Sequence, residues 1–126
     1  MAQSQVRTYS INARSTDTFG RVLCNTRNHH FIVDGPEQNG CPGEAVNPGE
    51  IFLAGVAACG VELVQVIAKS DGITPRSIAV EINGSMDRGN PVRQDLSVFN
   101  SVRLHFTLEG VTQAQADDLI GRFRQR

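Results

Sequence analysis

Three cysteines are the residues of this chain with the clearest capacity for chemistry. Cys24, Cys41 and Cys59 form an odd set without a Cys-x-x-Cys pair, so at least one thiol has no partner within the chain. In a reducing compartment all three are expected to be free. A free thiol either fills space as a small apolar side chain or, once ionised, acts as a nucleophile.

Cys59 has surroundings that are compatible with both roles. It lies between small residues, in Ala-Ala-Cys-Gly at 57–60, where a backbone or a ligand can approach closely. It is also about three turns beyond a predicted helix start, too far for the helix dipole to favour a thiolate. A thiolate at Cys59 therefore needs a neighbouring Arg, Lys or His. Spacing alone leaves the space-filling role and the nucleophilic role open.

Glu50 stands at the predicted start of the same helix. Residues 47–50, Asn-Pro-Gly-Glu, place Asn at the N-cap, Pro at the first helical position and Glu at N3, a variant of the capping box. The carboxylate is expected either to close the helix start or to take part in catalysis. Nine residues separate Glu50 from Cys59, which places them on opposite sides of a straight helix. Cooperation between them needs other residues or a second chain.

The adjacent histidines His29 and His30 are a poor metal site. Neighbouring side chains on a strand point to opposite faces, and two further plausible ligands do not stand nearby. The sequence has no phosphate-binding glycine loop, no Gly-x-Ser-x-Gly elbow and no His-Glu-x-x-His. We therefore predict neither a metal nor a cofactor.

The elements before and around the helix follow from turn residues and hydrophobic pattern. Strands are predicted for residues 5–13, 21–26 and 29–33, and a Gly- and Pro-rich loop for 34–49. The helix runs from 51 to about 70 and ends near Asp-Gly, where Gly can adopt a left-handed conformation. Because its first half has no polar face, we expect a sheet or a partner subunit to bury it.

After the helix, alternating apolar residues predict strands at 76–84 and 101–109. The polar segment between them is predicted to be irregular, although Leu96 and Val98 can begin the second strand. Thr112 opens a second helix, in which Gln115 is placed to complete a capping box.

Length and composition limit the class of protein. The 126 residues are 40% hydrophobic and 20% charged, which suits one domain with a core of its own. With 12 basic and 13 acidic residues, the net charge of −1 favours neither nucleic acid nor an anionic membrane as a partner. The first ten residues lack the apolar core of a signal peptide, and the longest apolar run, 51–61, is too short to span a bilayer. We expect one soluble cytoplasmic domain over 1–126.

Residues 47–59 resemble the signature of the OsmC-like family, which includes the osmotically inducible protein C and organic hydroperoxide resistance branches. The signature joins an Asn-Pro helix start, an acidic residue, an apolar helix and Ala-Ala-Cys at a fixed distance. The Asp-Gly-Pro at 34–36, the strand after Thr-Pro at 74–75 and the order of the elements support the resemblance. It covers residues 31–84 most closely.

The resemblance implies an α+β fold in which antiparallel sheets pack around a long buried central helix and two chains intertwine as a homodimer. It also implies that Cys59 is the peroxidatic cysteine, whose thiolate attacks an organic hydroperoxide and becomes a sulfenic acid. A second cysteine on the later helix then forms a disulfide, which a dithiol such as lipoyl-protein reduces. An arginine, matched here by Arg14 or Arg21, and a glutamate, matched by Glu50, organise the site.

This chain departs from the family pattern at two places. In the peroxidase branches the glutamate follows Asn-Pro directly, where this chain has Gly49; Glu50 comes one position later, as in other OsmC-like branches. The second cysteine of the family has no counterpart before Arg126, and the closing strand is also missing. The chain is then either a fragment cut before that cysteine or a natural variant without it. Of the two we expect the fragment, in which the domain in residues 1–126 lacks its C-terminal end.

The leading hypothesis is a bacterial thiol peroxidase of the oxidative stress response that reduces organic hydroperoxides. One alternative is a non-catalytic OsmC-like dimer that binds a small apolar ligand, with Cys59 only filling space. Another is an acyl-thioester enzyme of the hotdog type, which also wraps a sheet around a long helix. The run of strands before the helix counts against this last alternative.

Overall fold

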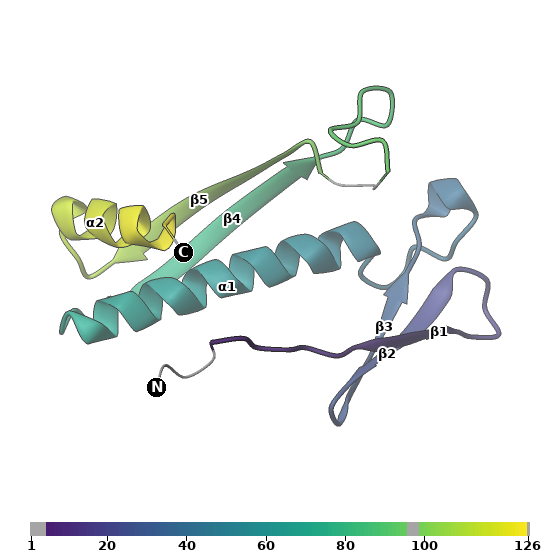
Figure 1. Cartoon of the computed structure of the whole chain (residues 1–126), viewed down its shortest axis with the longest axis horizontal. Helices are drawn as coiled ribbons and strands as arrows, with labels where there is room; N and C mark the ends of the chain where they lie inside the picture. Colours follow the sequence, from purple (N-terminus) through teal and green to yellow (C-terminus); the bar gives the residue numbers. More distant parts are fainter. Residues whose placement is uncertain (1–4, 96–98, 126) are drawn as a thin grey trace. The chain divides into compact units, whose positions relative to one another are not determined.

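The computed structural model describes residues 5–95 and 99–125 and has a mixed α+β fold with two antiparallel sheets and one long helix (Figure 1). The predicted α+β class with antiparallel sheets and a long central helix is thereby confirmed, whereas the intertwined homodimer stays a prediction. The chain divides into two compact units, Met1–Ile51 and Phe52–Arg126, and the boundary falls inside helix α1 (Pro48–Ser70). Leu96, Val98 and Arg126 lie outside the described residues.

The first unit contains a three-stranded sheet in the order β1-β2-β3, formed by Asn12–Ser15, Arg21–Thr26 and His29–Asp34. A turn at residues 27–28 joins β2 to β3, and Arg27 there has a positive φ of 52°. The second and third strands match the prediction. A short 3-10 helix, η1 (Glu37–Asn39), lies in the predicted loop.

The first strand was predicted wrongly, because β1 covers Asn12–Ser15 rather than residues 5–13. The register explains the difference. Asn12 pairs with Asn25, so residues before Ile11 run past Thr26, where β2 ends. Alternation of polar and apolar residues makes a strand only where a neighbouring strand offers its backbone groups.

Helix α1 begins and ends as its sequence predicts. Pro48 is its first residue, and the Ile51 N–H donates to the Asn47 carbonyl at 3.0 Å. At the other end Gly72 has φ 71°, and the Ile73 N–H donates to the Ala68 carbonyl at 2.9 Å. This is the left-handed glycine cap expected after residue 70.

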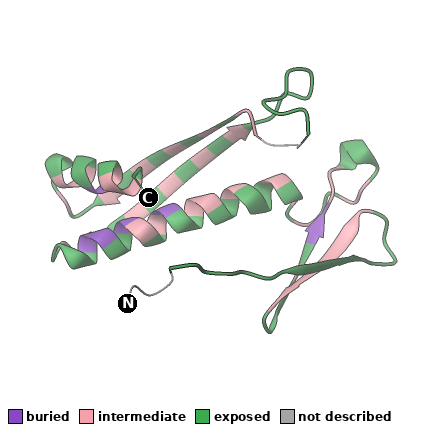
Figure 2. Ribbon diagram, in the orientation of Figure 1, coloured by how far each residue is buried: buried purple, intermediate pink, exposed green. Residues whose placement is uncertain are grey.

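The packed part of α1 is its second half, as Figure 2 shows by colour. Within the described chain its buried residues are Gly60, Val64, Ile67 and Ala68. Apolar side chains nearer its start are exposed, and Phe52 is 56% exposed. The single chain therefore leaves apolar helix surface open to solvent.

By length and composition alone, α1 is apolar enough to cross a membrane, and 22% of its most apolar stretch is buried. The prediction that no segment is long enough, which rested on residues 51–61 alone, was therefore wrong for the full helix. The core helix of a soluble protein passes the same test, so the result is weak evidence for a membrane span.

The second unit packs α1 and α2 (Gln113–Phe123) with a hairpin of β4 (Ser77–Ser85) and β5 (Ser101–Glu109). Both strands alternate half-buried and exposed residues along their whole length, as predicted. Leu119 of α2 is fully buried and clusters with the buried residues of α1. The ring of Phe106 contacts the ring of Phe123 edge-on, with centroids 5.4 Å apart.

The start of α2 confirms the predicted capping box. The Gln115 N–H donates to the Thr112 hydroxyl at 3.1 Å, and the Thr112 N–H donates to the Gln115 side chain at 2.9 Å. Arg122 on the same helix bonds to Asp71, just after α1, and to Asp118 at 2.8 Å. These contacts tie the end of α1 to α2.

Candidate functional site

Glu50 and Asn47 close the start of α1 by reciprocal hydrogen bonds. The Asn47 N–H donates to Glu50 Oε1 at 2.9 Å, and the Glu50 N–H donates to Asn47 Oδ1 at 2.8 Å. The predicted capping box is therefore present, with Asn in the place of Ser or Thr. The Glu50 side chain has a structural role whatever else it does.

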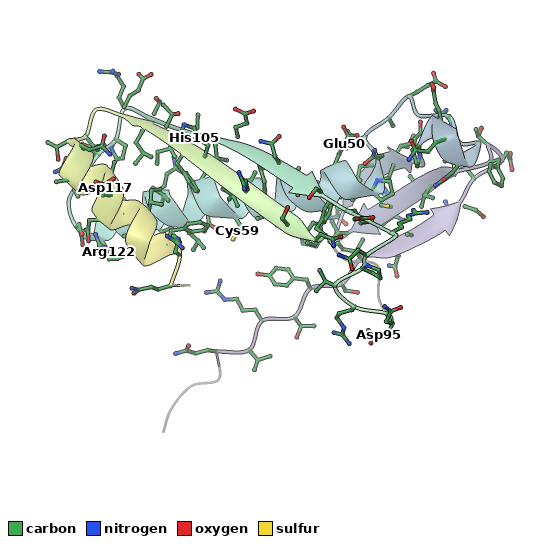
Figure 3. All side chains as sticks on the ribbon, turned by 90° about the horizontal axis from the view of Figure 1, so that it is seen from above. Glu50, Cys59, Asp95, His105, Asp117 and Arg122 are labelled. Carbon is green, nitrogen blue, oxygen red and sulfur yellow. The ribbon has the colours of Figure 1, made fainter. Side chains whose placement is uncertain are left out.

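Cys59 lies further along α1 and is exposed in the chain (Figure 3). The next residue, Gly60, is buried, and a Cβ there would lie 3.0 Å from Cζ of Phe106. The absence of a side chain at Gly60 thus lets the helix approach the aromatic ring, while the neighbouring thiol remains open to solvent. Exposure of this kind is what a reactive cysteine needs.

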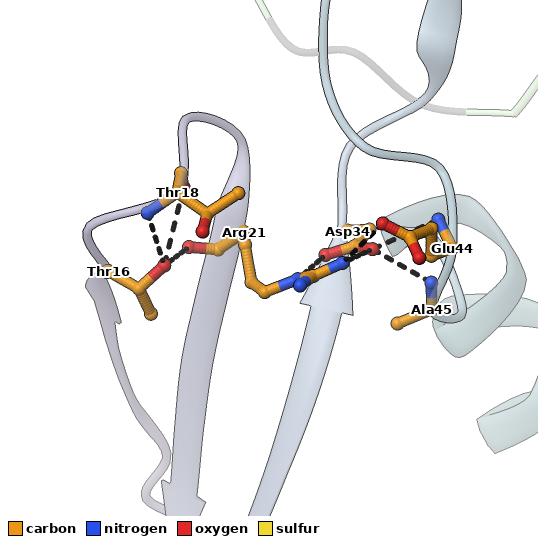
Figure 4. Close-up of polar contacts among 6 residues, drawn as sticks. All are labelled: Thr16, Thr18, Arg21, Asp34, Glu44 and Ala45. Atoms are coloured by element: carbon orange, nitrogen blue, oxygen red, sulfur yellow. Dashed lines mark hydrogen bonds and ion pairs between the residues drawn. The ribbon is translucent and has the colours of Figure 1, made fainter.

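Arg21 forms a two-pronged ion pair with Asp34 across the β2–β3 hairpin (Figure 4). Its Nε donates to Asp34 Oδ1 at 2.8 Å and its Nη2 donates to Oδ2 at 2.9 Å. Nη2 also lies 3.3 Å from Oε1 of Glu44. The Asp34 side chain has no exposed surface, whereas that of Arg21 is 28% exposed.

The Asp34 carboxylate also holds the loop that leads to α1. Its Oδ2 accepts the backbone N–H of Ala45 at 2.8 Å and that of Glu44 at 3.0 Å. The Arg21 guanidinium, followed by these two backbone donors, holds the pKa of Asp34 well below its ordinary value although burial raises it. The same pair raises the pKa of Arg21. Both groups are therefore charged at neutral pH.

Arg21 was predicted from the sequence as a site residue, but its ion pair with Asp34 was not. The signal was present in the hairpin. With Thr26 and His29 paired on either side of a two-residue turn, counting back along both strands places Arg21 opposite Asp34. Two residues of opposite charge that face each other at the end of a hairpin of apolar strands indicate an ion pair.

Arg14, the other arginine candidate, lies on β1 opposite Leu23 and is exposed. It takes part in no ion pair among residues 5–95 and 99–125. Arg14 and Arg21 lie on the same face of the three-stranded sheet, because cross-strand partners and alternate residues share a face.

The histidines show no metal site. His29 pairs with Thr26, and His30 pairs with Asn25, whose side-chain oxygen contacts His30 Nδ1. In the part of the chain that the structure describes, no group of three or more His, Cys, Asp or Glu side chains could hold a metal ion.

A hollow of about 520 Å³ lies between β5 and α2. His105 and Asp117, both labelled in Figure 3, are among its lining residues, and Cys59 is not. The Gln113 amide donates to Asp117 at 2.9 Å, so part of the polar lining is already paired. None of the predicted site residues is among those that line this hollow.

A family model described as OsmC-like protein matches residues 41–126, which is more than half of the chain. The match includes Glu50, Cys59 and the whole of α1. A search of curated proteins found no match.

Solved structures of similar fold cover nearly all of the chain. An OsmC-like protein from Mycoplasma pneumoniae superposes with a TM-score of 0.80 at 18% identity, over 95% of this chain and 82% of that one. The organic hydroperoxide resistance protein OsmC from Legionella pneumophila has a TM-score of 0.74 at 22% identity, over 97% and 85%.

A third similar structure contains a bound small molecule. It is a putative organic hydroperoxide resistance protein from Vibrio cholerae with captopril in one of the active sites. Its TM-score is 0.64 at 19% identity, with 98% of this chain and 83% of that chain covered. At such identities the structural likeness shows a shared fold.

Proposed function

The chain belongs to the family of OsmC-like proteins, and on that basis we propose that it is a thiol peroxidase that reduces organic hydroperoxides through Cys59. The observation that carries the proposal is the position of this thiol. It is exposed on α1, downstream of a capped Asn-Pro helix start. Similar folds include proteins named for organic hydroperoxide resistance, which supports the substrate class.

The reaction balances with one thiol and an external dithiol. The Cys59 thiolate attacks the terminal oxygen of the hydroperoxide, so an S–O bond forms, the O–O bond breaks and the alkoxide leaves as the alcohol after protonation. Cysteine is oxidised to a sulfenic acid by two electrons. One thiol of a dithiol such as lipoyl-protein then displaces water to form a mixed disulfide. The second thiol of the dithiol attacks this mixed disulfide, so Cys59 is released as a thiol and the dithiol leaves as a cyclic disulfide.

Arg14 or Arg21 supplies positive charge for the thiolate in this proposal, and Glu50 orients that charge. A cationic neighbour favours the ionised thiol that the attack requires. Glu50 stands one position later than the glutamate expected after Asn-Pro, because residue 49 is glycine. The reaction as proposed needs no metal or cofactor.

The working form is proposed to be a cytoplasmic homodimer. Apolar side chains of α1 remain exposed in the single chain, among them Ile51, Phe52 and Val66 at 38%, 56% and 46%. Burying such a surface against a second copy removes apolar area from water. Sedimentation velocity on the purified chain tests this part of the proposal, and a monomer at micromolar concentration contradicts it.

The test of the activity is thiol-dependent consumption of an alkyl hydroperoxide. Cys59→Ser is expected to abolish turnover, whereas Cys24→Ser and Cys41→Ser are matched controls expected to retain it. Mass spectrometry of the wild type after one equivalent of hydroperoxide, with dimedone present, is expected to find the sulfenic acid adduct on Cys59. Turnover by Cys59→Ser equal to that of the wild type contradicts the proposal.

One observation favours a second function, binding of a small apolar molecule without catalysis. Phe52 stacks on Phe99 with ring centroids 5.4 Å apart, and more than half of Phe52 is exposed. An apolar probe that binds equally to the wild type and Cys59→Ser, together with no hydroperoxide turnover by the wild type, would favour this function. Replacement of Phe52 by Ala would then weaken binding.

A further inference from the structure

We propose that Asp34 and Arg21 are positioning residues, which hold residues 44–46 so that the capping box of Asn47 and Glu50 forms in one fixed place. We call these two residues and the groups they bind, in residues 44–46, the clamp. The contacts of the clamp do not depend on the proposed function, and only its effect on turnover rests on that function.

The hydrogen bonds of the clamp connect strand β3 to the residues that come directly before α1. The side chain of Asp34 accepts the N–H groups of Glu44 and Ala45, and the Asp34 N–H donates to the Val46 carbonyl at 3.0 Å. Three consecutive residues are therefore bound to one strand residue. The next residue, Asn47, is the N-cap of α1 and binds Glu50.

Rotation of the Asp34 carboxylate is prevented by Arg21. The two prongs from Nε and Nη2 fix the plane of the carboxylate, and only then does Oδ2 face both backbone donors. With all its hydrogen-bond partners in place, the buried carboxylate of Asp34 permits one arrangement of residues 44–46. A lysine at position 21 would keep the charge but could not hold both oxygens.

The clamp also separates the roles of the two arginine candidates. The fork of Arg21 is engaged with Asp34 and touches Glu44, so moving it toward a thiolate would leave a buried carboxylate without its counter-charge. Such a loss is costly because the charge remains out of water. Arg14 has no ion pair among the described residues, so it is the candidate of the two that is free to meet an anion.

Amide hydrogen exchange tests the clamp without any assay of activity. In Arg21→Lys and Asp34→Asn, the N–H groups of Glu44, Ala45 and Asn47 are expected to exchange at least about tenfold faster than in the wild type. Asp95→Asn is the matched control, since Asp95 forms an exposed two-pronged pair with Arg93. It should leave those three rates unchanged.

Two exchange results overturn the proposal. The first is unchanged exchange at Glu44 and Ala45 in a folded Arg21→Lys protein. The second is faster exchange at those two amides with Asn47 unchanged, because the loop would then move without moving the cap. Should Asp34→Asn fail to fold, Arg21→Lys supplies the same comparison.

Kinetics connects the clamp to Glu50. Arg21→Lys is expected to lower kcat about tenfold or more with little change in KM, and to have less than about a twofold effect in the Glu50→Gln background. Equal effects in both backgrounds overturn the link, because the clamp would then act independently of Glu50. If the wild type has no turnover, the proposed function fails, whereas the exchange experiment still decides the clamp.

Discussion

Replacing Glu50 by glutamine separates the two roles that this carboxylate can have. Glutamine keeps an oxygen that can accept the Asn47 N–H, which lies 2.9 Å from Glu50 Oε1, so the capping box survives. The substitution removes the negative charge. If Glu50 acts only as a cap, activity stays near that of the wild type; if its charge serves the reaction, activity falls while the fold remains.

The expected changes in stability follow from the contacts at the helix start. Glu50→Gln loses the attraction of a carboxylate to the helix N-terminus, about 0.3–1 kcal/mol. Glu50→Ala also loses the hydrogen bond to Asn47, a further 0.5–1.5 kcal/mol or so. Asn47→Ala removes the acceptor of the Glu50 N–H at a cost of about 1 kcal/mol but keeps the charge. For a chain of this size 1 kcal/mol corresponds to a Tm shift of roughly 3–5 °C.

The assay pairs thermal unfolding with hydroperoxide turnover measured well below every Tm. We expect Glu50→Gln to unfold within about 5 °C of the wild type and to lose at least about tenfold in kcat. Asn47→Ala should show the reverse, with a lowered Tm and retained turnover, because its backbone N–H still binds the Glu50 carboxylate.

Two results would refute this reasoning. Turnover by Glu50→Gln at the wild-type rate would show that the carboxylate serves only the helix. A loss of stability in Glu50→Gln as large as in Glu50→Ala would show that the glutamine does not rebuild the cap.

Two further predictions concern stability. Leu119→Ala, which empties a fully buried position in the cluster of α1 and α2, should lower the free energy of unfolding by about 2–5 kcal/mol in urea titrations; Val92→Ala, at a 63% exposed position, should change it by less than about 0.5 kcal/mol. The ion pair with Arg21 lowers the pKa of Asp34 in the folded state, so its contribution is complete above the unfolded-state pKa, about 4, and is lost as the pH falls below it. The stability of the wild type should therefore decline more steeply below pH 4 than that of Asp34→Asn, and equal slopes would contradict the assignment.

Local hydrogen bonds made much of this fold predictable. The caps at Asn47 and Thr112 join residues three apart, so the residue types at those positions carry the whole signal. The alternation in β4 and β5 is equally local, and each strand begins and ends within one residue of the predicted bounds. The prediction of the first strand failed because the extent of β1 depends on where β2 ends, and the residues of β1 do not indicate that position.

The candidate site likewise has a part that could be predicted from local sequence and a part that could not. The sequence by itself determined the helix start, its carboxylate and the cysteine nine residues later, because helix geometry places residues from their spacing alone. Only the tertiary structure decided that the Asp34 carboxylate, which the hairpin register places opposite Arg21, also binds the backbone before the helix. The physical reason is that a charge can be buried only where partners from separate strands and loops meet, and folding brings those partners together.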